Sequence, residues 1–191
     1  MRVGDVAALV PVKSFIDAKE RLSPVLGEAA RQELAKTLAE GVLKAVAGLH
    51  TAVVCDDDDV ATWAHNLGAE VVWAPGRGLN RAVAAGVAHL ESRGFGRITV
   101  VHADLPFPAH LATLPDTEGI VLVPDRHGDG TNVISIPAGC GFEFAYGTAS
   151  FPRHLATARR LGLDVTVLDD TELGIDVDLP DDLELIETFT R

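Results

Sequence analysis

The sequence contains little cysteine. Only Cys55 and Cys140 occur among its 191 residues, and two cysteines are too few for the disulfide framework of a small secreted protein. Neither residue belongs to a C-x-x-C pair or to a Cys/His spacing typical of zinc sites. The pattern therefore predicts two small core residues in a reducing compartment.

Long apolar runs are also absent. Hydrophobic residues make up 47% of the chain, yet no uninterrupted stretch approaches the roughly 20 residues that a bilayer-spanning helix needs. Residues 1–5 carry an acid where a signal peptide carries basic charge, and the apolar stretch that follows is too short and lacks a small-residue cleavage pattern. We therefore expect a soluble, cytoplasmic protein with no membrane partner.

Positive charge is scarce. The chain has 16 basic and 28 acidic residues, which gives a formal net charge of −12. The average surface would repel a nucleic-acid backbone, so we expect no nucleic-acid partner. A few cations and backbone N–H groups can still hold a small polyanion such as a triphosphate. A bound Mg²⁺ would offset part of the remaining repulsion.

Repeats, low-complexity tracts and linkers are missing as well. A single domain usually spans roughly 100–200 residues. The sequence therefore predicts one domain over residues 1–191.

Hydrophobic periodicity indicates alternating strands and helices. Residues 6–12 form a short apolar run typical of a buried strand, and apolar positions at three- and four-residue spacings predict an amphipathic helix over residues 28–49. The other predicted strands cover residues 51–55, 70–73, 98–102, 119–123, 132–136 and 164–168, and the other predicted helices cover residues 59–67, 79–93, 151–161 and 180–188. This alternation predicts the α/β class, with a parallel or mostly parallel sheet covered on both faces and ligands at the carboxyl ends of its strands.

Three cations follow the first predicted strand within nine positions. Lys13, Lys19 and Arg21 together could neutralise a triphosphate. The segment is not a P-loop, because Val12 replaces the last glycine of that motif and no upstream glycine has the required spacing. The alternative interpretation is a solvated basic loop, since charge runs usually face water.

Acidic residues follow two later strands. Asp104 comes directly after the apolar strand of residues 98–102, and Asp176 and Asp178 lie on the same side of an extended chain. Mg²⁺ prefers hard oxygen ligands and is usually shared between one or two carboxylates and substrate phosphates. Asp104 with one of this pair fits that need. Alternatively, the acids of residues 178–182 cap the last helix, and His102 is a core histidine at a strand end.

Three loops offer further polar groups. Glycines in residues 124–132 permit positive φ beside Thr131, and Ser150 lies near the start of a predicted helix, where anions can bind. Gly78 and Asn80 open another helix and could approach a flat base. Taken alone, these segments are also consistent with a hairpin loop, a helix cap and a turn.

In chain order, these segments resemble the guanylyltransferase family that activates 2-phospholactate or phosphoenolpyruvate in biosynthesis of the deazaflavin coenzyme F-420. The resemblance runs nearly end to end. It is carried by residues 11–13, 18–22, 78–80, 103–106, 124–132, 147–154 and 176–178. Nucleotidyltransferases for sugars, molybdopterin and methylerythritol share the strand-end aspartate and the late D-x-D but usually carry a glycine-rich first loop.

The resemblance implies a GT-A-like, Rossmann-related three-layer α/β/α nucleotidyltransferase fold. It implies that the first loop, with Pro11, Lys13 and Lys19, holds GTP together with the region of Gly78 and Asn80. It further implies that Thr131, Gly147 and Ser150 bind the phosphorylated acid, and that Asp104, Asp176 and Asp178 bind Mg²⁺. Glu20 and Leu179 depart from the family pattern, but neither change removes a ligand.

The implied reaction transfers GMP from GTP to phosphoenolpyruvate or 2-phospho-L-lactate and releases pyrophosphate. Positioning and charge neutralisation, with Lys13, Lys19 and Arg21 on the triphosphate and Asp104 on the metal, would supply the catalysis. A downstream transferase that consumes the unstable product is an expected partner. Two alternatives stay open: a nucleotidyltransferase with another acceptor, such as a sugar phosphate, or with CTP, and a nucleotide-binding module without catalysis.

Overall fold

The computed structural model describes residues 5–114, 117–170 and 172–189. Its strands are β1 (Val6–Pro11), β2 (His50–Cys55), β3 (Glu70–Trp73), β4 (Arg97–Val101), β5 (Ile120–Pro124), β6 (Thr131–Pro137) and β7 (Val165–Val167). Its α-helices are α1 (Glu28–Ala45), α2 (Asp58–Asn66), α3 (Gly78–Ser92), α4 (Ser150–Arg160) and α5 (Pro180–Phe189), and two short 3-10 helices are η2 (Glu20–Leu22) and η3 (Pro108–Thr113).

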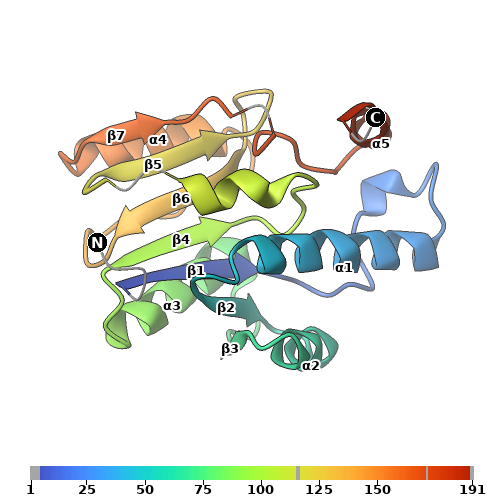
Figure 1. The fold of residues 1–191 in the computed structure, drawn as a ribbon, viewed down its shortest axis with the longest axis horizontal. Coiled ribbons are helices and arrows are strands. Elements are labelled where there is room, and N and C mark those ends of the chain that lie inside the picture. The colour runs from blue at the N-terminus through green and yellow to red at the C-terminus, as the bar shows by residue number, and fades with distance from the viewer. Residues whose placement is uncertain (1–4, 115–116, 171, 190–191) are drawn as a thin grey trace.

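The seven strands form one sheet in the order β3-β2-β1-β4-β6-β5-β7. Every neighbouring pair is parallel except the two pairs that β6 makes with β4 and β5. Figure 1 shows the arrowheads of β1, β4 and β5 pointing to one edge and β6 running the opposite way. Thr131, the first residue of β6, therefore lies at the edge where the parallel strands end, which is the edge expected to bind ligands.

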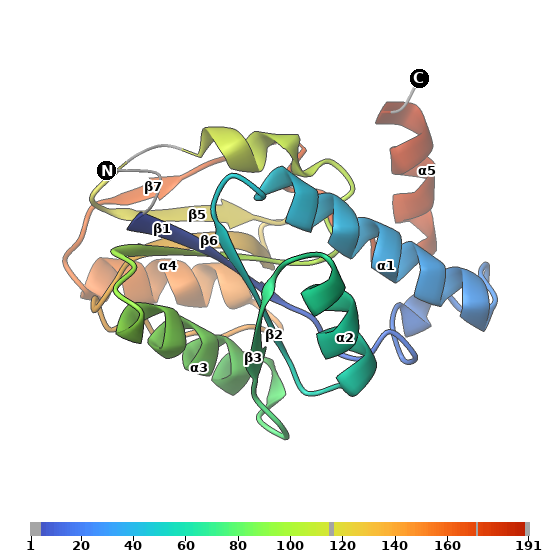
Figure 2. The same ribbon diagram turned by 60° about the horizontal axis from the view of Figure 1, so that its bottom comes forward.

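Helices cover both faces of the sheet, as the α/β prediction requires. Alternate residues of β1 face opposite sides, because side chains of a strand alternate: Ala8 and Val10 pack with α1 and α2, whereas Ala7 and Leu9 pack with α3. Figure 2 shows the sheet separating α1 from α3 and α4. The fold is a three-layer α/β/α sandwich with a mostly parallel mixed sheet.

The predicted elements agree with the observed ones to within a few residues. The main differences are that α1 ends at Ala45 instead of residue 49 and that η2 and η3 were not predicted. After Ala45, Val46 takes a non-helical conformation (φ −100°, ψ 7°) and a turn leads into β2. The apolar spacing continued through Val46 and so extended the predicted helix too far.

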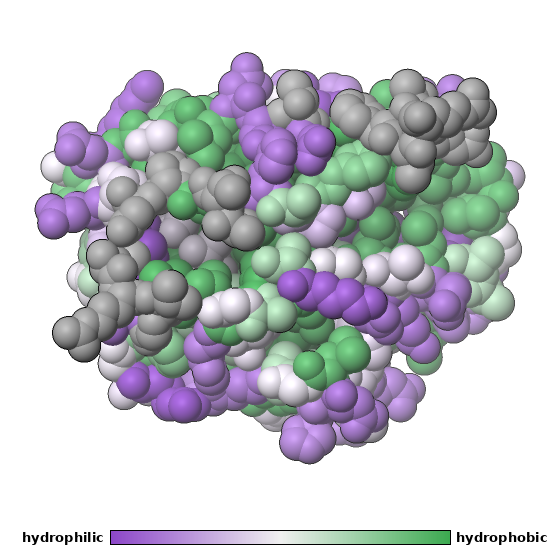
Figure 3. Space-filling model, viewed as in Figure 1, coloured by the Kyte–Doolittle hydropathy of each residue, from purple (hydrophilic) through white to green (hydrophobic). Residues whose placement is uncertain are grey.

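The surface around α1 is mixed. Figure 3 shows hydrophilic side chains beside hydrophobic surface in this region, and Glu33 and Lys44 of the helix are exposed. None of the helices in the described ranges is both long and apolar enough to cross a bilayer.

Candidate active site

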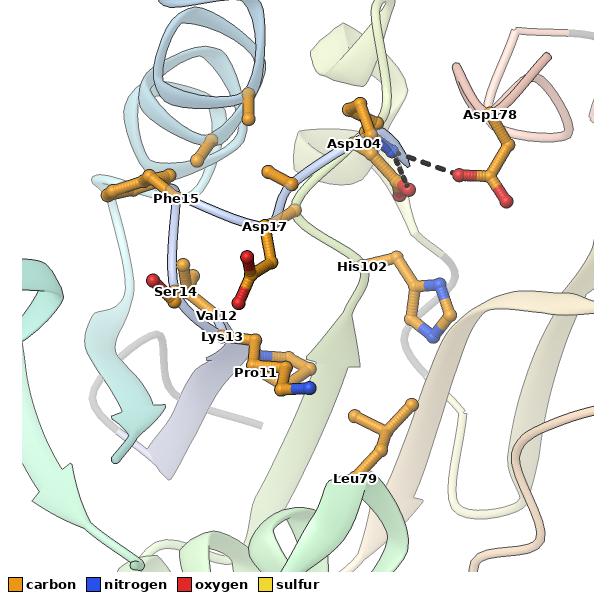
Figure 4. Close-up of a pocket in the computed structure, with 15 residues that line it drawn as sticks. Pro11, Val12, Lys13, Ser14, Phe15, Asp17, Leu79, His102, Asp104 and Asp178 are labelled. Atoms are coloured by element: carbon orange, nitrogen blue, oxygen red, sulfur yellow. Dashed lines mark hydrogen bonds and ion pairs between the residues drawn. The ribbon is translucent and has the colours of Figure 1, made fainter. Parts of the chain in front are cut away.

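A cavity of about 320 Å³ opens at the carboxyl ends of β1 and β4. Figure 4 shows Lys13 and Pro11 on one side of it, Asp104 and Asp178 on another, and His102 and Leu79 along the side that faces the first loop. The cavity thus joins the first loop, the end of β4 and the segment before α5. These segments are far apart in the sequence and meet because their strands end at one edge of the sheet.

Lys19 lies between two carboxylates of this site. Its Nζ is 2.6 Å from Oδ2 of Asp104 and 3.3 Å from Oδ1 of Asp178, and only 9% of its side chain is exposed. Its backbone is left-handed (φ 55°), a conformation that costs a residue with a Cβ about 1–2 kcal/mol. Backbone strain of this kind is typical of functional sites, and here it occurs at the residue whose ammonium lies between two carboxylates.

The charges of the Lys19 pair stabilise each other. Burial would lower the pKa of Lys19, but the carboxylates of Asp104 and Asp178 outweigh it and raise that pKa. Burial would raise the pKa of Asp104, but the Lys19 ammonium and, to a smaller extent, His102 lower it. Both groups are therefore charged at neutral pH. Arg21 adds a second cation, with its Nη1 3.2 Å from Oδ2 of Asp178.

Asp176 has the opposite electrostatic environment. Burial raises its pKa to about 6, and the neighbouring carboxylates of Asp104, Asp178 and Asp125 act in the same direction. No hydrogen bond or ion pair engages the Asp176 carboxylate within the described residues. The Lys19 ammonium acts in the opposite direction, but burial and the three carboxylates outweigh it, so the pKa of Asp176 stays raised.

Asp182 positions the acidic segment. Its Oδ2 accepts the backbone N–H groups of Asp178 (2.7 Å) and Leu179 (2.6 Å), and its Oδ1 is 2.5 Å from Nη2 of Arg126. Asp182 therefore caps α5. The Asp178 carboxylate is instead directed to Lys19 and Arg21, so the alternative in which Asp178 is only a cap does not describe its contacts.

The acidic residues have the donor set that a hard divalent cation prefers. Oδ1 of Asp104 is buried without a hydrogen-bond partner while Oδ2 binds Lys19, and Asp176 carries a carboxylate destabilised by other carboxylates. As the side chains stand, no group of three or more His, Cys, Asp or Glu residues in the described ranges is spaced to hold a metal. The Lys19 ammonium separates two of the acids instead, so an ion would have to take over its position.

A second cavity, of about 470 Å³, lies beside the first at the ends of β1, β2 and β3. Pro11, Val12, Lys13 and Leu79 line both cavities, so the two share a wall. Gly78 also lines the second cavity, with a positive φ of 64° at the start of α3. Pro11, Lys13 and Gly78 thus line one cavity, and their contact with the nucleotide stays a prediction.

The structure brings both Ser150 and His154 to the hydroxyl of Thr131. Ser150 Oγ is 3.5 Å from Thr131 Oγ1, which is 3.0 Å from His154 Nδ1. The backbone N–H of Ala145 donates to His154 Nε2 (2.8 Å), so the imidazole hydrogen must be on Nδ1 and donates to Thr131. Burial lowers the pKa of His154 to about 4, which keeps the ring neutral. Thr131 and Ser150 are 1% and 2% exposed and line neither cavity.

Loop contacts fix the segment of residues 145–150. Asp129 accepts the backbone N–H of Ala149 (3.1 Å to Oδ2), and Arg153 donates to the carbonyl of Thr148 (2.7 Å). Gly147 has a φ of 114°, which only glycine adopts readily. Ala149, and not Ser150, is the N-cap of α4, and Ser150 is its first residue.

Asn80 joins this segment to α3. Its Oδ1 accepts the N–H of Tyr146 (2.6 Å) and its Nδ2 donates to the carbonyl of the same residue (3.3 Å). Asn80 was predicted to contact the nucleotide, and that contact stays a prediction. The Tyr146 ring packs against His102 and His154, with ring centroids 5.0 and 4.9 Å apart.

Most of the predicted residues form two groups at one edge of the sheet, and Arg21, Gly78, Asn80 and Asp176 lie outside these two groups. The cavity group holds Pro11, Lys13, Lys19, Asp104 and Asp178, and the loop group holds Thr131, Gly147 and Ser150. Sequence reasoning assigned no role to the supporting residues His154 and Arg126, and it assigned Asp182 only a capping role. A charged or polar residue that supports another gives no periodic signal, so only the spatial contacts identify it.

Known proteins share both the sequence pattern and the fold of this chain. Residues 6–189 match the family model described as guanylyl transferase CofC like. A phosphoenolpyruvate guanylyltransferase of Sphaerobacter thermophilus is 36% identical over 171 residues, covering 84% of this chain and 82% of the relative. A 2-phospho-L-lactate guanylyltransferase of Methanothermobacter thermautotrophicus is 32% identical over 170 residues, covering 85% and 75%.

Solved structures support the fold. A crystal structure from Desulfovibrio desulfuricans G20, described under the class of nucleotide-diphospho-sugar transferases, has a TM-score of 0.81 at 19% identity and covers 98% of this chain and 88% of that one. A nucleotidyl transferase from Methanothermobacter has a TM-score of 0.65 at 14% identity and covers 97% and 98%. At these identities the likeness concerns the fold alone.

Proposed function

This chain belongs to the guanylyl transferase CofC-like family, and we propose that it transfers GMP from GTP to a small phosphorylated three-carbon acid. The relatives at 32–37% identity include enzymes for phosphoenolpyruvate and for 2-phospho-L-lactate. These two acids are the proposed acceptors. The observation that carries the proposal is the convergence of Lys13, Lys19, Asp104 and Asp178 on one cavity.

The triphosphate of GTP would lie in the first cavity. Lys13 and Lys19 line it, and Arg21 lies beside it through its contact with Asp178. An ammonium or guanidinium group close to phosphate oxygens forms strong charge-assisted hydrogen bonds. Lys19 would leave Asp104 and turn to the phosphates when the nucleotide binds.

Asp104, Asp176 and Asp178 would hold Mg²⁺. The unpartnered Oδ1 of Asp104 and the raised pKa of Asp176 support this assignment, because both are relieved by a cation. When bound, Mg²⁺ neutralises charge on phosphate oxygens. Asp182 and Arg126 would keep the Asp176–Asp178 segment in place.

The chemistry needs no protein nucleophile. A phosphate oxygen of the acid attacks the α-phosphorus of GTP, a new P–O bond forms, and the bond from the α-phosphorus to the bridging oxygen breaks as pyrophosphate leaves. The lysines and Arg21 would stabilise charge on the triphosphate and on the departing pyrophosphate. Positioning of the two substrates would supply the remaining acceleration.

The acceptor would bind near the loop group. Thr131, Ser150 and the exposed Gly147 lie where the sheet edge meets the start of α4. His154 donates a hydrogen bond to Thr131 and fixes its orientation. We further propose a cytoplasmic enzyme whose unstable product passes to a downstream transferase, with neither nucleic acid nor membrane as a partner. The net charge of −12 supports the exclusion of nucleic acid.

The decisive experiment measures pyrophosphate release with Mg²⁺ and each pairing of a nucleotide with an acid. We expect release with GTP and one or both of phosphoenolpyruvate and 2-phospho-L-lactate, and loss of at least about 100-fold in turnover for Asp104→Asn. Asp58→Asn, which changes an exposed acid outside both cavities, is a matched control and should retain turnover. Release with a sugar phosphate but with neither acid would refute the proposed acceptor, and full turnover of Asp104→Asn would refute the metal site.

A further inference from the structure

The second cavity has walls suited to a flat ring. Val54, Ala74, Leu79 and Ala82 contribute apolar surface, and Lys13 and Asp56 are the charged residues that line it. Its volume of about 470 Å³ lies within the range of small-molecule sites, roughly 300–1,000 Å³. A mostly apolar pocket with very few polar groups is the arrangement that holds an aromatic ligand and fixes its orientation.

The position of the cavity assigns it to the nucleoside end of the nucleotide. It shares Lys13 and Leu79 with the first cavity, where Lys19 and Asp104 lie. If the triphosphate occupies the first cavity, the base has an adjoining apolar cavity to enter. This step rests on the proposed function.

One carboxylate oxygen of Asp56 is without a hydrogen-bond partner in the part of the chain that the structure describes. The neighbouring Asp57 caps α2, because its Oδ1 accepts the N–H groups of Asp59 and Val60 at 3.0 Å. Asp56 Oδ2 accepts only a long hydrogen bond from the Gly76 N–H (3.3 Å), and its Oδ1 has no hydrogen-bond partner within the described residues. Of the acids in residues 56–59, Asp56 is the one that lines the cavity.

We propose that the Asp56 carboxylate selects guanine by accepting hydrogen bonds from its N1–H and its 2-amino group. Guanine presents these two donors side by side, which matches the two oxygens of a carboxylate. Adenine and cytosine each present one amino group beside a ring nitrogen that is itself an acceptor, and uracil presents one N–H between two carbonyls. A carboxylate facing those edges would meet a lone pair, which costs affinity.

The Gly76 contact gives Asp56 a second role in the same pocket. It ties the loop that follows β3 to the end of β2, and this loop leads to Gly78 at the start of α3. Added Cβ atoms at Gly76 and Gly78 would meet nothing within 4 Å. The backbone there is open on that side, so a base could approach it closely.

The test compares nucleotide binding to the wild type, Asp56→Asn and Asp56→Ala by calorimetry with GTP, ITP, XTP and ATP, without acceptor. ITP lacks the 2-amino group and should bind the wild type roughly ten-fold more weakly than GTP. Asp56→Ala should bind GTP at least about ten-fold more weakly. The amide group that Asp56→Asn introduces can donate to the 2-oxo group of xanthine, so this variant should shift the XTP-to-GTP affinity ratio at least about ten-fold toward XTP.

Asp58→Asn is the matched control, because it removes an exposed acid of the same run that does not line the cavity. It should leave every affinity within about two-fold of wild type. Unchanged GTP affinity and an unchanged XTP-to-GTP ratio in Asp56→Asn would overturn the assignment. Because binding is measured without acceptor, a wild type that binds GTP but releases no pyrophosphate with any acid would refute the proposed reaction while leaving the guanine contact supported.

Discussion

Replacement of Lys19 by methionine should destabilise the metal-free protein. The substitution removes the ammonium from between Asp104 and Asp178 and leaves an unbranched side chain that is one atom shorter. Methionine at this position bears the same left-handed backbone strain as lysine, so the variant and the wild type differ mainly in charge. The variant therefore isolates the electrostatic contribution of this residue.

The magnitude follows from the exposure of the partners. Removing one member of a buried ion pair usually costs about 3–5 kcal/mol, because the other charge is left uncompensated. The side chains of Asp104 and Asp178 are 23% and 43% exposed, so water screens part of the effect and we expect about 2–3 kcal/mol. For a chain of this size, that loss lowers Tm by roughly 4–12 °C.

The assay is thermal and urea denaturation of both proteins, first without divalent cations and then across a Mg²⁺ titration. Mg²⁺ should raise the Tm of Lys19→Met more than that of the wild type, because no ammonium has to be displaced. Lys44→Met is the control, since Lys44 is 76% exposed and its 3.7 Å pair with Glu40 is worth about 0.5 kcal/mol or less. If Lys19→Met matched this control in metal-free buffer, the ammonium would not hold the acids together.

Three further predictions concern Asn80, His154 and Glu70, the last of which pairs with His50, His89 and Arg93 away from both cavities. Asn80→Ala removes both hydrogen bonds to Tyr146, so the Tyr146 amide should exchange roughly ten-fold faster by hydrogen-exchange NMR; unchanged protection would contradict the tether. His154→Gln removes the imidazole donor to Thr131 and should raise the acceptor KM roughly ten-fold with the GTP KM unchanged, whereas a rise in the GTP KM alone would exclude this role. Burial would raise the pKa of Glu70, but hydrogen bonds from His89 and His50 and the charge of Arg93 outweigh it and lower that pKa. The stability that Glu70 contributes is therefore complete above its unfolded pKa of about 4.3 and is lost as the pH falls through its folded pKa. Glu70→Gln should cost about 1–2 kcal/mol at pH 7 by urea denaturation, and a gap between the two proteins that does not shrink as the pH falls below about 4.3 would contradict this assignment.

The sequence was sufficient to predict most of the fold. Apolar runs such as residues 6–12 and 98–102 marked buried strands, because a strand covered on both faces must be apolar throughout. The direction of β6 could not be predicted in this way. Its apolar pattern is the same for either direction, and only the short connection of residues 125–130, with Asp125 accepting the N–H groups of Asp129 and Gly130, makes β5 and β6 a hairpin.

The site was predictable where residues follow strands. Lys13 and Asp104 come directly after β1 and β4, and parallel neighbours end at one edge, so their proximity follows from topology. Two other contacts could not be derived. Lys19 depends on a left-handed backbone, and His154 depends on a buried hydrogen bond to a residue 23 positions away. Neither leaves a periodic trace in the sequence.

The reversed strand β6 also divides the sheet into two parts. On one side, the loops after β3, β2, β1 and β4 line the second cavity and most of the first, and on the other, β6, β5 and β7 lead to Thr131 and to the acidic segment whose Asp178 completes the first cavity. The seam is the antiparallel ladder between β4 and β6, one of the two antiparallel ladders that β6 makes. Under the proposed function, relatives could exchange one small acid for another through mutations around Thr131, whereas mutations of Asp178 on the same side would also alter the cavity proposed for the triphosphate.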